Sequence, residues 1–181
     1  MEPLDSAPPG TPNSGTAGAG AARSAATGSG TSASGTDRAG SPCFVSHVRV
    51  AFGDCDPANI VYFPNFYRWL DQATHELCEA AGYELTRVRR ELGWVGFPLA
   101  EAGARFHRPA TINDSLRIET RVREWRRRMF LLDHRILRDD LLLVEGWQTR
   151  FIGVHLADQG GRLGAMAIPG QFLDAVNRQM T

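Results

Sequence analysis

The sequence of 181 residues has little of what marks several protein classes. Its three cysteines, Cys43, Cys55 and Cys78, are odd in number and widely spaced, which excludes a disulfide framework or a cysteine-based zinc site. Such cysteines fit free thiols in a reducing cytoplasm. No stretch approaches the ~18 consecutive apolar residues of a membrane-spanning helix, and no apolar segment follows a basic start, as it would in a secretion signal. We therefore expect a cytoplasmic protein without a membrane span.

An excess of charge of one sign is also missing. Twenty basic residues balance twenty acidic ones, so the formal net charge is +0. This balance argues against bulk attraction to nucleic acid or to an anionic membrane, although it permits a local basic patch. The length is that of one domain with a sizeable core.

Residues 1–42 lack large apolar side chains and consist mostly of glycine, serine, alanine and threonine. A segment of this composition cannot bury enough apolar surface to offset the loss of chain entropy on folding. We predict a disordered tail or flexible linker over residues 1–42 and a folded domain over residues 43–181.

The folded part changes its hydrophobic period along the chain. Residues 44–52 alternate as a strand does. From Pro64 the apolar residues recur every three or four positions, which predicts a helix that ends near Gly82. The remaining expected elements are a short helix over 85–92, strands over 94–109 (interrupted by Pro98 and Gly103), 115–125, 129–137 and 142–156, a turn over 158–164 and a short helix over 169–179. Successive strands joined by short turns predict an antiparallel sheet, and one long helix on that sheet makes an α+β fold.

The stretch 52–71, FGDCDPANIVYFPNFYRWLD, places two acids directly before the long helix. Asp54 and Asp56 lie on one face if the chain is extended, and Pro57 favours an extended Asp56. The first N–H groups of a helix can stabilise a developing negative charge. A carboxylate beside them can attack a carbonyl or activate a water while the N–H groups receive the oxyanion.

A carboxylate beside the free N–H groups of a helix start favours a thioester substrate over an ester or amide. A thiolate leaves readily because the thiol pKa is about 8.5, whereas the other leaving groups usually need a general acid, commonly histidine. None of the five histidines lies within 52–71. The spacing alone leaves another interpretation open, in which Asp54 and Asp56 are only capping or turn residues. Cys55, between two carboxylates, lacks the positive charge that would activate its thiol.

The same stretch closely resembles the signature of the 4-hydroxybenzoyl-CoA thioesterase family of hotdog-fold enzymes. The resemblance implies that Asp56 is the catalytic carboxylate, that the backbone N–H of Phe63 polarises the carbonyl, and that Asp71 lies near the distal end of the acyl group. A second segment, LRIETRVREWRRRMF, resembles the family's basic stretch, which implies contacts to the phosphates of coenzyme A. That role falls on Arg126, Arg127 and Arg128.

The resemblance covers about residues 45–154 and implies an α+β hotdog fold, in which a curved antiparallel sheet of about five strands wraps a long helix. The sequence departs from the family at two positions. Asn59 stands where glycine is usual, and asparagine tolerates a left-handed backbone. Phe97 stands where similar enzymes have a threonine near the substrate, so its ring is expected to reshape an acyl pocket that Tyr62 also lines. The basic run has a second interpretation as a solvated hairpin end, although arginine suits phosphate well.

The implied activity is hydrolysis of acyl-CoA thioesters, with hydroxybenzoyl-CoA or another aromatic or short acyl-CoA as substrate. No metal or cofactor is expected, because coenzyme A is part of the substrate. Hotdog domains pair through their sheets, which implies a homodimer or a homotetramer with sites at the subunit interface. Two alternatives remain: an acyl-CoA-binding module without turnover, and a hydratase or dehydratase. The second needs a histidine with an acid at the site, and no histidine lies near this helix start.

Overall fold

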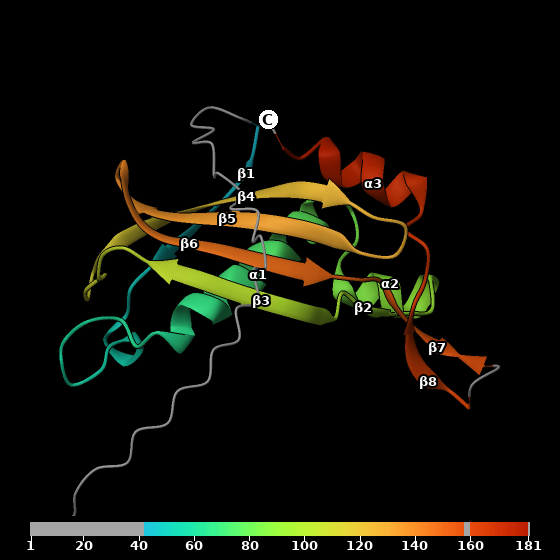
Figure 1. Ribbon diagram of the computed structural model, residues 1–181, viewed down its shortest axis with the longest axis horizontal. Coiled ribbons are helices and arrows are strands. Elements are labelled where there is room, and N and C mark those ends of the chain that lie inside the picture. The colour runs from blue at the N-terminus through green and yellow to red at the C-terminus, as the bar shows by residue number, and fades with distance from the viewer. Residues whose placement is uncertain (1–41, 158–159, 181) are drawn as a thin grey trace, which may run out of the picture. The chain divides into compact units, whose positions relative to one another are not determined.

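The computed structural model describes residues 42–157 and 160–180, and these belong to one compact unit (Figure 1). Of the tail predicted over residues 1–42, all but Pro42 lies outside the described residues. The elements in chain order are β1 (Phe44–Arg49), the 3-10 turn η1 (Phe52–Asp54), α1 (Pro64–Ala80), α2 (Leu85–Glu91), β2 (Trp94–Gly96), β3 (Leu99–Phe106), β4 (Ser115–Trp125), β5 (Phe130–Arg138), β6 (Leu141–Arg150), β7 (Gly153–Leu156), β8 (Arg162–Ala165) and α3 (Gly170–Asn177).

The main sheet has five strands in the order β1-β4-β5-β6-β3, and every pairing is antiparallel. Helix α1 crosses one face of this sheet (Figure 1). Alternate side chains of the central strands, such as Leu116, Ile118 and Ile136, are buried with α1 residues in one core cluster. The α+β class and the five-stranded antiparallel sheet are confirmed.

The bounds of α1 follow from its local sequence. Pro64 occupies the first helical position, where a missing N–H costs nothing. Gly82 follows the capping residue Ala81 with φ of 86°, a left-handed conformation that glycine adopts without strain. The apolar stripe of α1 is buried against the sheet, and Leu70 packs over Gly146, where a methyl group would overlap its side chain. Burying each such leucine contributes about 1.5–3 kcal/mol.

Two predicted strand segments, 94–109 and 142–156, are each divided between two sheets. The prediction for 94–109 becomes β2 and β3, and the prediction for 142–156 becomes β6 and β7. Strands β2, β7 and β8 form a second, antiparallel sheet in the order β2-β7-β8. The prediction of a turn through 164 was also wrong, because β8 begins at Arg162. The first division falls at Pro98, one of the two interruptions expected in 94–109, whereas no interruption was expected within 142–156.

Helix α3 closes the other end of the core with aromatic contacts. Phe172 is fully buried and stacks on Phe97, with ring centroids 5.5 Å apart. Trp125 and Phe130, at the turn between β4 and β5, also pack against Phe172. These contacts tie the β4–β5 turn to the C-terminal helix.

His134 is a buried histidine on the helix-facing side of β5. Its Nδ1 lies 3.0 Å from the hydroxyl of Thr120. Burial, aided by the positive charge of Arg150, lowers the pKa of His134 to about 3. The folded protein therefore holds His134 neutral, while the unfolded chain takes up a proton once the pH falls below about 6.5.

Stability should consequently fall as the pH drops from about 6.5 toward 3. Between pH 7 and pH 5 we expect the wild type to lose about 2 kcal/mol more unfolding free energy than His134→Gln, which carries no such proton. Urea unfolding at both pH values measures the difference. If wild type and His134→Gln lose the same unfolding free energy between pH 7 and pH 5, His134 does not contribute to the pH dependence of stability.

Candidate active site

The segment between β1 and α1 is not the extended chain expected through Asp54. Residues Phe52–Asp54 form the 3-10 turn η1 instead. The Asp54 carboxylate accepts the N–H of Ala51 at 2.9 Å and pairs with Arg68 at 2.6 Å. Because both carboxylate oxygens are engaged within the protein, Asp54 is a turn and ion-pair residue. The capping interpretation is right for this acid, and the two acids do not continue one strand.

Asp56 sits in a tightly bonded loop. Its N–H donates to the carbonyl of Ile60 and its carbonyl accepts the N–H of Asn59, both at 2.9 Å. Asn59 adopts φ of 61°, so the left-handed conformation expected of it is confirmed. The Oδ1 of Asp56 accepts the N–H of Ala58 at 2.8 Å. Within residues 42–157 and 160–180, its Oδ2 accepts no hydrogen bond.

Asp56 lines a pocket of about 350 Å³. The other lining residues are Phe52, Gly53, Cys55, Pro57, Asn59 and Ile112. The ring of Phe52 is 85% exposed, so one wall of this pocket is apolar surface that faces outward. One carboxylate oxygen is fixed by Ala58 and the other is available to a bound molecule.

The start of α1 offers one free backbone donor. Pro64 has no N–H, and the N–H groups of Asn65 and Phe66 donate to the carbonyls of Tyr62 and Phe63. Across the part of the chain that the structure describes, the N–H of Phe63 donates to no protein acceptor. An unpaired N–H at the positive end of a helix dipole is suited to a developing oxyanion.

The loop and the helix start are tied together through one carbonyl. The carbonyl of Asp54 accepts both the N–H of Tyr62 and the side-chain amide of Asn65, each at 2.9 Å. The rings of Tyr62 and Phe63 meet edge to face with centroids 5.4 Å apart. Both rings are more than half exposed, and neither lines the Asp56 pocket. Asp56, Tyr62 and Phe63 thus belong to the same end of α1.

Asp71 and Phe97 belong to a second group, organised by Arg150 of β6. Arg150 is 2% exposed, and its guanidinium donates to the carboxylate of Asp71 and, at 2.9 Å, to the carbonyl of Phe97. The amide oxygen of Gln148 accepts from Arg150 and from the hydroxyl of Thr74. The charge of Asp71 is therefore balanced by a buried cation. The ring of Phe97 lies inside the aromatic core with 3% exposure.

The predicted phosphate-binding arginines form a third group at the other end of the sheet. Arg126, Arg127 and Arg128 occupy the turn between β4 and β5, while the loop of Asp56 lies beside the start of β4 (Figure 1). Strand β4 has 11 residues and separates the two ends by about 35 Å. Arg126 already pairs with Glu124 at 2.8 Å, whereas Arg127 and Arg128 contact no acceptor among the described residues. A single chain does not bring these arginines to Asp56.

The sequence matches a family model described as the thioesterase-like superfamily over residues 50–176. The chain belongs to the thioesterase-like superfamily. It is 38% identical over 133 residues to 4-hydroxybenzoyl-CoA thioesterase of Pseudomonas sp. strain CBS-3, a match that covers 70% of this chain and 92% of that enzyme. The match to a solved structure of that thioesterase covers 74% of this chain and 99% of that one, with 32% identity and a TM-score of 0.69.

Two further similar proteins are named for aromatic acyl-CoA substrates. A gentisyl-coenzyme A thioesterase structure is 30% identical, with a TM-score of 0.64, and covers 73% of this chain and 98% of its own. A 1,4-dihydroxy-2-naphthoyl-CoA hydrolase of Synechococcus sp. strain WH7803 is 29% identical over 105 residues, which is 55% of this chain and 69% of that hydrolase. The architecture of the chain is the hotdog fold that the resemblance implies.

Two residues of this superfamily member escaped the sequence analysis. Arg150 organises the second group, and Arg68 holds Asp54. Arg150 left a signal, because Gln148 and Arg150 place polar side chains on the helix-facing side of β6, where apolar residues are expected. No such signal exists in the sequence for Arg68, because an arginine in the first turns of a helix is common on protein surfaces.

Two kinds of feature are absent from residues 42–157 and 160–180. No helix there is long and apolar enough to cross a bilayer. No group of three or more histidine, cysteine, aspartate or glutamate side chains there is arranged to hold a metal ion.

Proposed function

We propose that this protein hydrolyses acyl-CoA thioesters to the free acid and coenzyme A at Asp56. The observation that carries the proposal is the one free N–H at the start of α1, that of Phe63, on the same loop-helix unit as a carboxylate with an unpaired oxygen. The thioester oxygen binds to the Phe63 N–H, and Asp56 either attacks the carbonyl carbon or removes a proton from water. The C–S bond breaks, the thiolate leaves and takes a proton, and water supplies the second oxygen of the acid.

The acyl group we propose is aromatic and carries a hydroxyl. The relatives named above act on hydroxybenzoyl, gentisyl and dihydroxynaphthoyl thioesters. In this chain the Asp71 carboxylate pairs with Arg150, and the side chain of Asp71 is still half exposed. Such a carboxylate accepts a hydrogen bond from a ring hydroxyl and repels an acidic acyl group.

We also propose that the working unit is a homodimer, alone or as half of a tetramer. Strand β3 is an edge of the main sheet, and unpaired edges favour pairing with a second copy. Antiparallel pairing of two β3 edges about a two-fold axis sets the Leu99 end of one strand beside the Phe106 end of the other. Phe106 packs on Phe66 and Tyr67 in the first turn of α1.

The two-fold arrangement would bring the arginine-rich β4–β5 turn of one copy to the Asp56 end of α1 in the other copy. Leu99 pairs with Arg150, which pairs with Phe130 beside the arginine-rich turn. The turn of one copy therefore approaches the Asp56 end of its partner.

We also propose a cytoplasmic location. Cys43, Cys55 and Cys78 are free thiols, and a reducing compartment keeps thiols in that form.

A thiol-release assay on a panel of acyl-CoA thioesters tests the proposed function. We expect one coenzyme A and one free acid per thioester, with hydroxylated aryl-CoA substrates turned over fastest. Binding of acyl-CoA without thiol release would instead identify a binding module. Addition or loss of water with the thioester intact would identify a hydratase or dehydratase.

Replacing Arg126, Arg127 and Arg128 together with alanine should raise KM for acyl-CoA by about tenfold or more and spare acyl-pantetheine, which has no nucleotide phosphates. The sequence contains no lysine, so arginine is the cation available for this contact. Steady-state kinetics on both substrates measure the effect. Equal losses on both would contradict phosphate binding at this turn.

Mixing that triple variant with Asp56→Asn tests whether the arginines act on the partner's site. If they do, random dimers refolded from an equal mixture regain about a quarter of the wild-type sites at low substrate concentration, because each heterodimer has one site with Asp56 and arginines intact. If the arginines act within their own chain, no heterodimer has an intact site and activity stays at the level of the separate variants.

A further inference from the structure

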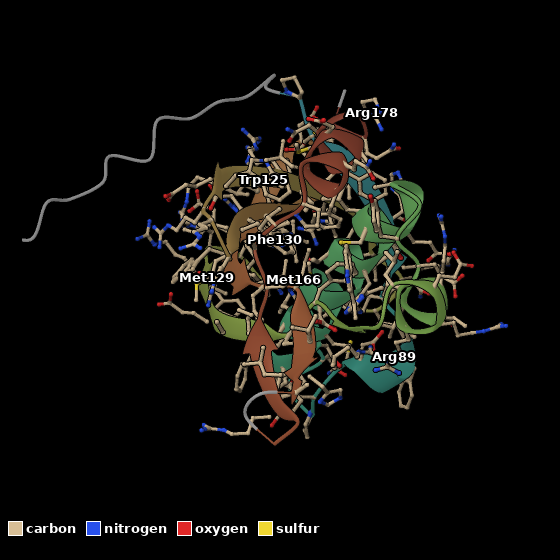
Figure 2. The ribbon with its side chains drawn as sticks, turned by 90° about the vertical axis from the view of Figure 1, so that its right-hand side faces the viewer. Arg89, Trp125, Met129, Phe130, Met166 and Arg178 are labelled. Atoms are coloured by element: carbon tan, nitrogen blue, oxygen red, sulfur yellow. The ribbon has the colours of Figure 1, made fainter. Side chains whose placement is uncertain are left out.

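A pocket of about 620 Å³ lies at the end of α1 that is remote from Asp56, where the turn after α1, α2, β2 and α3 meet. Figure 2 looks onto this end of the molecule, with Arg178 at the end of α3 and Met166 in the segment that joins β8 to α3. Helix α1 has 17 residues, so about 25 Å separates this pocket from the start of α1. A volume of ~300–1,000 Å³ is what proteins use for small molecules. None of the steps assigned to Asp56 and Phe63 uses this pocket.

One wall of the pocket is aromatic and is fixed from behind. The rings of Tyr83 and Trp94 lie 3° from parallel, with centroids 5.6 Å apart. Both rings meet the fully buried ring of Phe172 edge to face, with centroids 4.9 and 5.9 Å away. Leu92, which is 44% exposed, and Met166 extend the apolar surface. Such a wall suits the body of an aromatic ligand.

The pocket also presents hydrogen-bond donors that lack a protein partner. Trp94 is only 7% exposed, yet its indole N–H remains reachable from outside and donates to no acceptor among the described residues. Arg178 is exposed at the C-terminal cap of α3, and its guanidinium has no hydrogen-bond or ionic partner in the described part of the chain. Arg87 donates to the carbonyl of Gly82 at 2.6 Å and to Glu91 at 2.9 Å, which leaves it further N–H groups.

The charge of the pocket is positive. None of the described residues that line it is acidic. Because Glu91 balances the charge of Arg87, the uncompensated charge is that of Arg178. A nearly buried N–H without a partner costs free energy until a ligand or water accepts from it. The unpaired donors therefore call for a negatively charged acceptor, and the adjoining wall calls for an apolar body.

We propose that this pocket binds an aromatic carboxylate, an inference that is independent of the proposed function. The carboxylate accepts from the guanidinium of Arg178 and from the indole N–H of Trp94. The ring of the ligand packs on Tyr83, Leu92 and Met166. A free phosphate would leave the apolar wall without use, and a neutral apolar ligand would leave the charge of Arg178 without use.

NMR of the full chain with isotope-labelled methionine methyl groups tests the proposal, with benzoate as the probe. The chain has four methionines, and Met166→Leu assigns the signal of the one that lines this pocket. Benzoate should shift the Met166 signal saturably, with a Kd on the order of 1 mM or below. Benzamide, which has the ring without the charge, and acetate, which has the charge without the ring, should each bind at least about tenfold more weakly.

Two substitutions probe the donors. Arg178→Gln should raise the Kd for benzoate about tenfold, because it removes the charge-assisted hydrogen bond. Trp94→Phe keeps an aromatic wall and loses the N–H, so it should weaken binding by about threefold or more. Arg90→Gln is the matched control, because Arg90 is exposed on α2 but does not line the pocket, and it should bind as the wild type does.

Asp56→Asn separates this pocket from the one at Asp56. It should give the same Met166 titration as the wild type, since Asp56 lies at the other end of α1, and thermal melting checks that every variant is folded. Loss of the Met166 shift in Asp56→Asn would show that the signal reports the Asp56 pocket and would overturn the proposal. So would the absence of a saturable Met166 shift at about 10 mM benzoate, or equal affinity of folded wild type and Arg178→Gln.

Discussion

Asp56→Asn should lower turnover of acyl-CoA thioesters by about a hundredfold or more, with little change in stability. The amide cannot act as a nucleophilic carboxylate or as a general base, and the loss of either role commonly costs this much. The amide oxygen of asparagine still accepts the N–H of Ala58, which holds the loop in the wild type. Steady-state kcat and the urea midpoint of the purified variant measure the two expectations.

Asp54→Asn is the matched control, two residues away in the same loop. Asp54 pairs with Arg68 and accepts the N–H of Ala51, so its substitution should cost stability. Its carboxylate is engaged within the protein, and we expect kcat to change by only a few fold in the folded variant. A reversal of the two results, with Asp54 essential and Asp56 dispensable, would show that the wrong acid has been assigned.

Phe63→Pro should cost about a hundred- to a thousandfold in kcat, the usual effect of losing one oxyanion donor. Proline removes the backbone N–H of residue 63, which makes no hydrogen bond within the described residues. The φ angle of Phe63 is −53°, close to the value that a proline ring imposes, so the backbone accepts the substitution at this residue.

Phe63→Ala separates the N–H from the ring. It keeps the backbone donor and loses only a side chain that is more than half exposed. We expect Phe63→Ala to retain most of the wild-type kcat. If the proline and alanine variants lose turnover to the same extent while both remain folded, the ring and not the N–H matters, and the oxyanion assignment is wrong.

Much of the fold follows from local signals in the sequence. The helix period that starts at Pro64 and the glycine at position 82 correspond to the observed bounds of α1. The alternation in residues 115–125 corresponds to β4 without a change of bounds. The left-handed Asn59 was also foreseeable from its residue type. Each of these features depends on the conformational preferences of residues that are close in the chain, and these preferences can be read from the residue types.

The features that were missed depend on contacts between distant residues. The division of two predicted strands between two sheets is decided by which strands pair, and alternation is the same in either sheet. The ion pairs of Asp54 with Arg68 and of Asp71 with Arg150 join residues that only the folded chain brings together. The separation of Asp56 from Arg126 along β4 is likewise a property of the tertiary structure.

A crystal structure of Asp56→Asn with an intact hydroxybenzoyl-CoA tests the central claim most directly, because the slow variant should hold its substrate. We predict the thioester oxygen at about 2.7–3.1 Å from the nitrogen of Phe63 and the side chain of residue 56 against the carbonyl carbon. A thioester bound with its oxygen on another donor, or outside the reach of residue 56, would contradict the account.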